Sequence, residues 1–215
     1  MAEKPMVFMH NSTMNLLAIS GTYRKGGTID RLIDHAIEGA RAADPRIEVE
    51  RVQLIDQRIE YCRNCMACKK DDPAKPYARC VIDDDMQSIY PLIERADAYI
   101  FGTPVNMAHE TAVMKTFLER VCWVFSRPSP RWRPLKGCPE PRSSRKKKAG
   151  IIVSSGLVPP LLRIFCDEAT SLLKSTCGCV LNAKVVGSFY AGAVHARGVE
   201  PYLEKAFNLG RALVD

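Results

Sequence analysis

The stretch MNLLAISGTYRKGGTIDR, residues 14–31, determines the fold of this chain. Its first part, MNLLAIS, is a short apolar run that is typical of a buried strand. Over residues 28–42 apolar side chains recur every three or four positions, which predicts an amphipathic helix. A glycine-containing loop joins the two. A strand, a glycine-rich turn and a helix in this order are typical of α/β proteins that bind an anion at the helix N-terminus.

The rest of the chain repeats this alternation of strands and helices. Further strands are predicted at residues 46–55, 98–104, 149–156 and 183–190. Helices are predicted at residues 84–98, 111–125, 159–176 and 199–213, and Pro91 is expected to shorten or kink the first of these. The pattern predicts one α/β domain, 1–215, with five parallel strands covered by helices on both faces. The ligand site of such a sheet lies beyond the carboxyl ends of the strands, where the strand order reverses.

The composition argues against several classes of protein. Residues 1–13 form an extension without the apolar core of a secretory signal, and no apolar run is long enough to cross a bilayer. A cytoplasmic location without membrane contact is therefore expected. The net charge is +7, but residues 127–148 alone carry nine Arg or Lys and one Glu, so the remaining chain is nearly neutral. This segment is predicted to be a basic, Pro-rich loop whose RKKK run at 145–148 is solvated or attracts an anionic partner. Nucleic acid is not an expected partner, because no basic stripe with interleaved aromatics lies elsewhere.

The glycine-containing loop favours a monophosphate ligand. Thr22 and Thr28 offer hydroxyl donors, Arg24 offers a guanidinium fork, and the helix N-terminus offers backbone N–H groups. A triphosphate-binding loop would carry a lysine where this chain has Gly27, and the dinucleotide pattern G-x-G-x-x-G is missing. The alternative is a plain glycine-rich turn in which Thr28 only caps the helix.

A second loop, TPVNMAHETAVMKTFLER at residues 103–120, follows the strand at 98–104. Pro104 fixes the backbone as it leaves the strand, and residues 105–108 expose main-chain N–H and C=O groups. Thr111 can cap the next helix. A segment of this kind is suited to bind a flat heterocycle rich in amides and ring nitrogens.

At these two loops the chain resembles the flavodoxin-like NAD(P)H-dependent FMN reductases, in particular their iron–sulfur flavoprotein branch. The segment GTYRKGGT fits a one-residue-shorter form of the family's phosphate loop, G-S-x-R-K-x-G-x-T. The family's second loop reads S-P-V-Y, then S-G-x-L-K and F-L-D-R. It is matched identically or conservatively at Thr103, Pro104, Val105, Thr111, Met114, Lys115, Phe117, Leu118, Glu119 and Arg120. The resemblance covers roughly residues 14–156 and continues more weakly beyond them.

The resemblance implies a three-layer flavodoxin-like domain that binds FMN and uses NAD(P)H as co-substrate. The FMN-binding residues that it implies are Thr22, Arg24, Gly27, Thr28, Ile29, Pro104, Val105, Asn106, Met107, Ser155 and Gly156. Asn106 stands where the family often has an aromatic residue, and Met107 can take its place by sulfur–aromatic packing. His109 is expected to be a solvated loop residue rather than a catalytic one. No catalytic side chain is required, because the cofactor carries the reactivity.

The cysteine-rich loop at 61–83 raises the question of a metal site. It holds Cys62, Cys65 and Cys68 at spacings of three residues, and Cys80 follows after a gap of eleven residues. The iron–sulfur branch has a compact cysteine cluster at this place, so the resemblance implies one [4Fe–4S] cluster on these four thiols. The gap is longer than the branch usually shows, and zinc or no metal at all are the alternatives. Four other cysteines are expected to pack in the core, namely Cys122, Cys166, Cys177 and Cys179, while Cys138 is unassigned.

These features predict an FMN-dependent oxidoreductase that takes hydride from NAD(P)H and passes electrons to a small-molecule or protein acceptor, directly or through the cluster. The resemblance implies a homodimer or homotetramer, because family members complete the flavin crevice across a subunit interface. The main alternative is a non-enzymatic flavin or iron–sulfur electron carrier or redox sensor. A carrier shields its flavin between aromatic rings, whereas the loop at 103–110 has none, which favours an enzyme. A nucleotide-dependent structural protein is the more distant alternative.

Overall fold

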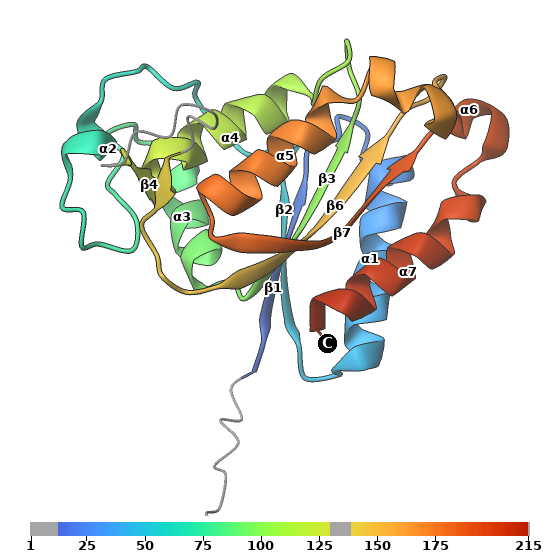
Figure 1. The fold of residues 1–215 in the computed structure, drawn as a ribbon, viewed down its shortest axis with the longest axis horizontal. Helices are drawn as coiled ribbons and strands as arrows, with labels where there is room; N and C mark the ends of the chain where they lie inside the picture. Colours follow the sequence, from blue (N-terminus) through green and yellow to red (C-terminus); the bar gives the residue numbers. More distant parts are fainter. Residues whose placement is uncertain (1–12, 130–138, 215) are drawn as a thin grey trace, which may run out of the picture.

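The computed structural model describes residues 13–129 and 139–214 and is organised around one parallel sheet (Figure 1). The strands are β1 (Asn15–Ser20), β2 (Glu48–Gln53), β3 (Ala98–Pro104), β6 (Lys147–Ser154) and β7 (Ala183–Ala191). They pair in the order β2-β1-β3-β6-β7, so the direction of the chain across the sheet reverses between β1 and β3. The predicted five-stranded flavodoxin-like sheet is confirmed. Cys138, most of the N-terminal extension and the middle of the basic loop lie outside the described residues.

Helices cover both faces of the sheet. Figure 1 shows α1 (Thr28–Ala43) and α7 (Glu200–Val214) on one side, and α3 (Met86–Arg95), α4 (Ala112–Phe125) and α5 (Glu168–Cys179) on the other. Each side has its own apolar core. Smaller elements are the helices α2 (Ala67–Lys70) and α6 (Val194–Arg197), the 3₁₀ turns η1 (Leu54–Asp56) and η2 (Pro160–Phe165), and the strand pair β4 (Ser126–Arg127) and β5 (Glu140–Pro141). Within the described residues, no helix combines the length and apolar character needed to span a membrane.

Several predicted elements differ from the structure at their ends. The helix predicted at 84–98 is shorter, Met86–Arg95, with Pro91 inside it. The strand predicted at 46–55 ends at Gln53 and continues as η1. The helix predicted at 159–176 is instead the 3₁₀ turn η2 followed by the separate helix α5. The α-helix begins only after Asp167, whose carboxylate accepts a hydrogen bond from the Thr170 N–H at 3.0 Å.

The RKKK run is not the solvated loop that the sequence predicts. Its last two residues begin β6, and the Lys147 side chain is buried, with 4% of its surface exposed. Its Nζ donates to the carbonyl oxygens of Ile93 and Glu94, at 2.7 Å each, and to Tyr99 Oη at 2.9 Å. These carbonyls end α3, where a cation is favoured by the helix dipole. Burial nevertheless lowers the pKa of the Lys147 amine to about 8.

We expect the wild type to gain stability with rising pH relative to a Lys147→Met variant. The pKa of this amine is about 8 in the folded chain and the ordinary 10.5 in the unfolded chain. At pH values between the two, the unfolded chain keeps a proton that the folded chain has released. Stability rises with pH wherever the unfolded state binds more protons. From about pH 7.5 to about pH 9.5 the free energy of unfolding should rise by about 1–2 kcal/mol more in the wild type, as measured by urea denaturation.

Lys146→Met is the matched control for this experiment, because it removes an exposed amine from the same run. It should keep the pH dependence of the wild type. If Lys147→Met and the wild type show equal pH dependence, the buried amine does not titrate as described.

Candidate functional site

A cavity of about 390 Å³ lies at the carboxyl ends of β1, β3 and β6. All predicted FMN-binding residues line it except Gly27, namely Thr22, Arg24, Thr28, Ile29, Pro104, Val105, Asn106, Met107, Ser155 and Gly156. Ala108 and Ser154, which belong to the second and third predicted loops, also line it. Sequence reasoning missed the remaining lining residues, which are Leu157, Val158, Cys166, Val194 and His195. The fold therefore brings three loops, each far from the others in sequence, to one hollow at the point where the strand order reverses.

The first loop presents hydrogen-bond donors to this cavity. Thr22 is buried, and its Oγ1 accepts from the Arg24 N–H at 3.2 Å. The Arg24 side chain is exposed and has no carboxylate partner among the residues that the structure describes. Gly27 is the N-cap of α1 and supplies no side-chain cap, so the alternative in which Thr28 caps this helix is wrong. The N–H groups of the first turn of α1 are left available to a ligand.

Asp30 gives this loop its shape, and sequence reasoning missed it. Its buried carboxylate accepts from Ser20 Oγ at 2.7 Å and from the Gly26 N–H at 2.8 Å, and it pairs with Arg51 at 2.9 Å. Gly26 has φ +67°, a left-handed conformation that glycine adopts without strain. Burial alone would raise the pKa of Asp30, but hydrogen bonds from Gln53, Ser20 and Gly26, together with Arg51, lower it. The carboxylate is therefore ionised and neutralised locally, so it holds the loop closed beside the cavity.

The second loop is a tight turn between β3 and α4. The Val105 N–H donates to the Ser154 carbonyl at 2.7 Å, which ties this loop to the end of β6. Asn106 and His109 exchange two backbone hydrogen bonds of 2.8 and 3.0 Å, and the residues between them, Met107 and Ala108, have φ values of +51° and +68°. Met107 is 95% exposed at the tip of the turn. His109 is exposed and is not among the residues that line this cavity.

Hydrogen bonds lock the first two loops together. Thr111 Oγ1 donates to the Gly21 carbonyl at 2.6 Å, and the Ala112 N–H donates to Tyr23 Oη at 3.1 Å. Thr111 also caps α4 as predicted, because its Oγ1 accepts from the Met114 N–H at 3.3 Å. The relative position of the two loops is thus set by the protein itself.

The third loop closes the cavity from the side of β6 and β7. The Ser155 N–H donates to the Ala191 carbonyl at 2.9 Å, and the His195 N–H donates to the Gly156 carbonyl at 3.0 Å. A Cβ on Gly156 would lie 2.6 Å from the His195 ring, so glycine is needed for the ring to pack here. His195 follows β7, and its place at the cavity depends on this pairing of two distant segments.

Cys166 was predicted to pack in the core, and this prediction is wrong. It is only half-buried, it lines the cavity, and its Sγ lies 3.8 Å from Tyr190 Oη. Cys166 is the C-cap of η2 and lies between this turn and α5, so it is not part of a core helix. Cys177, in contrast, is fully buried in the core as predicted.

A second, larger groove of about 800 Å³ lies on the other side of the 105–109 turn. It is lined mainly by α4 and α5, and His109, Lys115 and Glu168 are among its polar residues. The smaller cavity is the candidate ligand site in spite of this difference in volume. Only the smaller cavity collects the ends of β1, β3 and β6 and the N-terminus of α1.

The four cysteines predicted to bind metal line one narrow cavity beside the C-terminal half of α4. Cys62 and Cys65 are exposed, while Cys68 and Cys80 are half-buried. Between the first three, Asn64 and Met66 adopt left-handed conformations with φ +50° and +61°, and these bends fold the short segment back on itself. Burial raises the pKa of the Cys68 thiol, and the neighbouring sulfurs of Cys80, Cys62 and Cys65 raise it further. The other three sulfurs therefore lie within electrostatic range of Cys68.

Within residues 13–129 and 139–214, no group of three or more Cys, His, Asp or Glu side chains is arranged to hold a single metal ion. A cubane cluster makes a different demand, because each of its four irons takes one thiolate. The thiols must then surround a space rather than converge on a point. The four cysteines line one cavity of about 30 Å³, so their number fits a cubane, but the loop would have to move outward to admit one.

Comparison with known proteins agrees with the fold and the loops. The family model of NADPH-dependent FMN reductases matches residues 14–197. An iron–sulfur flavoprotein of Archaeoglobus fulgidus is 33% identical over 147 residues, which are 68% of this chain and 57% of the relative. An iron–sulfur flavoprotein of Methanosarcina thermophila is 34% identical over 107 residues, which are 50% of this chain and 52% of the relative. The chain thus spans about half the length of the curated relatives that it matches.

Among solved structures, an NAD(P)H:quinone oxidoreductase from Methanothermobacter marburgensis is similar, with a TM-score of 0.69 and 19% identity. The match covers 95% of this chain and 98% of that one. An FMN-dependent NADH-azoreductase from Bacillus anthracis, solved with FMN, has a TM-score of 0.66 and 11% identity over 94% of this chain and 100% of that one. At these identities the structures support the fold alone. The family match covers most of the chain, including the predicted loops, and the chain therefore belongs to the family of NADPH-dependent FMN reductases.

Proposed function

We propose that this chain is an FMN-dependent oxidoreductase that takes hydride from NAD(P)H and passes electrons to an acceptor through a [4Fe–4S] cluster. The observation that carries the proposal is the convergence of three loops on one cavity. This cavity contains buried and half-buried hydroxyls, a helix N-terminus and the Arg24 guanidinium, which has no carboxylate partner among the described residues. This is the donor set of a phosphate site at the switch point of an α/β sheet.

The residues of the first loop suit the single phosphate of FMN. Arg24 would form a charge-assisted pair with it, and the Thr22 and Thr28 hydroxyls would donate to its oxygens. Ile29 lies in the first turn of α1, where the helix dipole favours negative charge. The absence of a dinucleotide fingerprint from the sequence makes FAD the weaker candidate.

The residues of the second and third loops suit the flavin ring. Backbone groups of the turn at 105–108 and of Ser155 and Gly156 would orient it. When bound, FMN supplies the hydride-accepting and electron-releasing chemistry of the reaction. The turn carries no aromatic side chain, so one face of the ring would stay open for the nicotinamide. Met107, at the exposed tip of the turn, would contact the substrate at this open face.

The residues of the cysteine site suit an iron–sulfur cluster. Cys62, Cys65, Cys68 and Cys80 line one cavity, and several relatives bear the name iron–sulfur flavoprotein. α4 links the two sites, because its N-terminus contacts the phosphate loop and its C-terminal half lines the cysteine cavity. Along the axis of α4, Thr111 and Arg120 are separated by roughly 14 Å at 1.5 Å per residue. Electrons from the flavin would therefore have a short path to the cluster.

We also propose that the protein is a homodimer or homotetramer. The apolar side chains of Leu161, Ile164 and Phe165 are 88%, 79% and 81% exposed beside the flavin cavity, and a second copy would cover them. Sedimentation equilibrium should give a multiple of the chain mass of 24.0 kDa. A strict monomer with full activity would exclude the oligomer.

We expect the purified protein to release FMN on heating and to oxidise NADH or NADPH in the steady state. Chromatography of the released flavin distinguishes FMN from FAD, and stoichiometric FAD would contradict the assignment of the phosphate loop. Loss of NAD(P)H absorbance with a quinone or dye acceptor measures turnover. A protein that holds FMN but shows no turnover with either nucleotide would be an electron carrier or sensor instead.

A further inference from the structure

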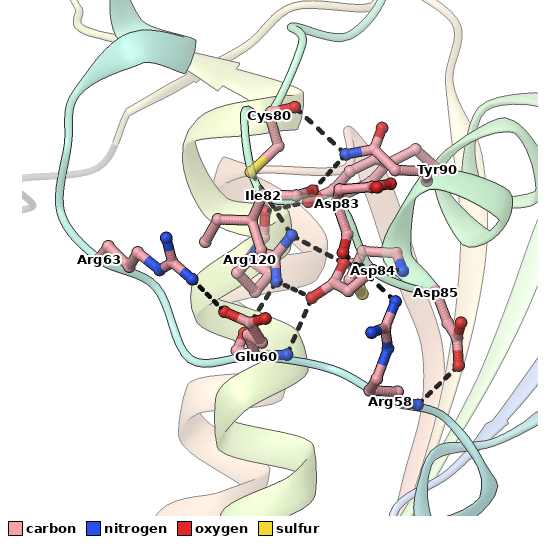
Figure 2. Close-up of polar contacts among 12 residues, drawn as sticks. Arg58, Glu60, Arg63, Cys80, Ile82, Asp83, Asp84, Asp85, Tyr90 and Arg120 are labelled. Atoms are coloured by element: carbon pink, nitrogen blue, oxygen red, sulfur yellow. Dashed lines mark hydrogen bonds and ion pairs between the residues drawn. The ribbon is translucent and has the colours of Figure 1, made fainter.

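Arg120 is a buried cation in the wall of the cysteine site (Figure 2). It belongs to α4, and only 2% of its surface is exposed. Its Nη2 donates to Cys80 Sγ at 3.4 Å. Because arginine is always protonated in proteins, this contact is a charge-assisted hydrogen bond to a sulfur that would bind iron.

The guanidinium of Arg120 is held in a fixed orientation. Asp84 pairs with it through both oxygens, which lie 2.5 Å from Nη1 and 3.1 Å from Nη2. Nη1 also donates to the Glu60 carbonyl at 2.8 Å. Asp84 in turn accepts from the N–H groups of Glu60 at 2.8 Å and Met86 at 3.1 Å, as the dashed contacts around it in Figure 2 illustrate for Glu60. The arginine therefore cannot turn away from Cys80 without breaking a buried bidentate pair.

The segment that carries Cys80 is fixed from the other side as well. Gln87 Nε2 donates to the Cys80 carbonyl at 3.2 Å and to the Ile82 carbonyl at 2.6 Å. Eleven residues separate Cys80 from Cys68, so Cys80 cannot be positioned by the short C-x-x-C turns that hold the other three cysteines. Arg120, Asp84 and Gln87 supply the missing constraint.

We propose that Arg120 is a positioning residue that holds Cys80 in place and raises the reduction potential of the cluster on Cys62, Cys65, Cys68 and Cys80. This inference rests on the proposed cluster. On reduction the cluster gains one electron, no bond breaks, and negative charge on the sulfurs increases. A cationic N–H donor fixed on one sulfur stabilises the reduced form more than the oxidised form, and hydrogen bonds to the sulfurs are a known determinant of cluster potentials.

A second buried arginine provides a matched control. Arg142 is 9% exposed and contacts the same loop. Within the part of the chain that the structure describes, it donates to backbone oxygens only, those of Cys68 and Asp72 at 2.9 Å and Ser126 at 3.1 Å. Arg120→Lys and Arg142→Lys make the same chemical change. The first changes a contact with the sulfur of Cys80, and the second changes a contact with the backbone carbonyl of Cys68. A general effect of losing a buried guanidinium would appear in both variants.

The test is a redox titration of anaerobically purified full-length protein, with the reduced cluster followed by electron paramagnetic resonance. The double variant Arg120→Met/Asp84→Asn is included, because it removes both members of the buried pair and leaves no uncompensated charge. Arg120→Lys and the double variant should disfavour cluster reduction about tenfold, a shift of about 59 mV to lower potential for a one-electron couple. Arg142→Lys should stay within about twofold of the wild type, or roughly 18 mV on the same scale.

The outcomes separate this inference from the proposed function. A wild type with normal flavin and no iron overturns the cluster and the role of Arg120 together. If the wild type holds the cluster but the Arg120 variants have the same reduction potential as the wild type, only the proposed role of Arg120 is overturned. Equal shifts in the Arg120 and Arg142 variants also overturn it. Loss of iron from both Arg120 variants with full iron in Arg142→Lys supports the positioning of Cys80.

Discussion

Replacing Cys65 with serine is expected to abolish the broad visible absorption of an iron–sulfur cluster and to leave the flavin bands intact. Cys65 is exposed and contributes no core packing, so the variant should fold normally. Loss of one thiolate leaves one iron of the cubane without its protein ligand. We expect cluster affinity to fall about 100-fold or more, since changes to outer-shell partners alone cost about 10–100-fold. Iron analysis and the absorption spectrum of protein prepared without oxygen measure the effect.

Cys177→Ala is the appropriate control for this substitution. Cys177 lies in α5, is fully buried in the core and does not line the cysteine cavity. Its loss should lower stability and leave iron content unchanged. Cys122 and Cys166 are poorer controls, because Cys122 lies within electrostatic range of Cys62 and Cys166 lines the flavin cavity. Full iron in Cys65→Ser would remove this cysteine from the proposed cluster.

Replacing Arg24 with alanine is expected to weaken FMN binding by roughly 1–3 kcal/mol, or about 5- to 150-fold in Kd. Arg24 lines the cavity and has no carboxylate partner among the described residues, so no internal ion pair is lost with it. The whole effect should then appear in the affinity for the phosphate, with little change in the stability of the apoprotein. Fluorescence titration of apoprotein with FMN measures Kd. Titration with riboflavin, which lacks the phosphate, should show almost no difference between variant and wild type.

Lys25→Ala provides the matched control for Arg24→Ala. Lys25 is the next residue in the same loop, but its amine lies 2.5 Å from Asp56 and it does not line the cavity. Its removal should change FMN affinity by less than about twofold, because an exposed ion pair contributes little. Equal losses in the two variants would mean that the loop attracts FMN through its overall charge. Unchanged affinity in Arg24→Ala would remove this residue from the site.

Much of the fold, and the cavity proposed to bind flavin, could be predicted because the relevant signals are local. Apolar runs and helical spacing identify the five strands of the sheet and the long helices α1, α4 and α7. Once the strands are parallel, their carboxyl ends must meet at one edge, so three loops can be assigned to one site before any contact is known. The predicted loop residues do line one cavity.

The features that the sequence does not reveal depend on contacts between distant segments. Lys147 is buried because α3 ends beside the start of β6, and His195 reaches the cavity because it pairs with Gly156. α1 and α7 touch through their backbones, since a Cβ on Gly210 would lie 1.8 Å from the Ala36 carbonyl oxygen. No periodicity in the sequence marks such a contact. Arg120 belongs to a predicted motif, but its contact with Cys80 appears only once the two segments are folded together.

Analysis of flavin, iron and acid-labile sulfide in protein purified without oxygen tests the central claim most directly. The proposed function predicts one FMN, about four iron ions and about four sulfides per chain, the composition of a single cubane cluster beside one flavin. One FMN with no iron and no sulfide would contradict the cluster and leave a plain flavin reductase. Iron and sulfide without flavin, or FAD in place of FMN, would contradict the assignment of the cavity at the ends of β1, β3 and β6.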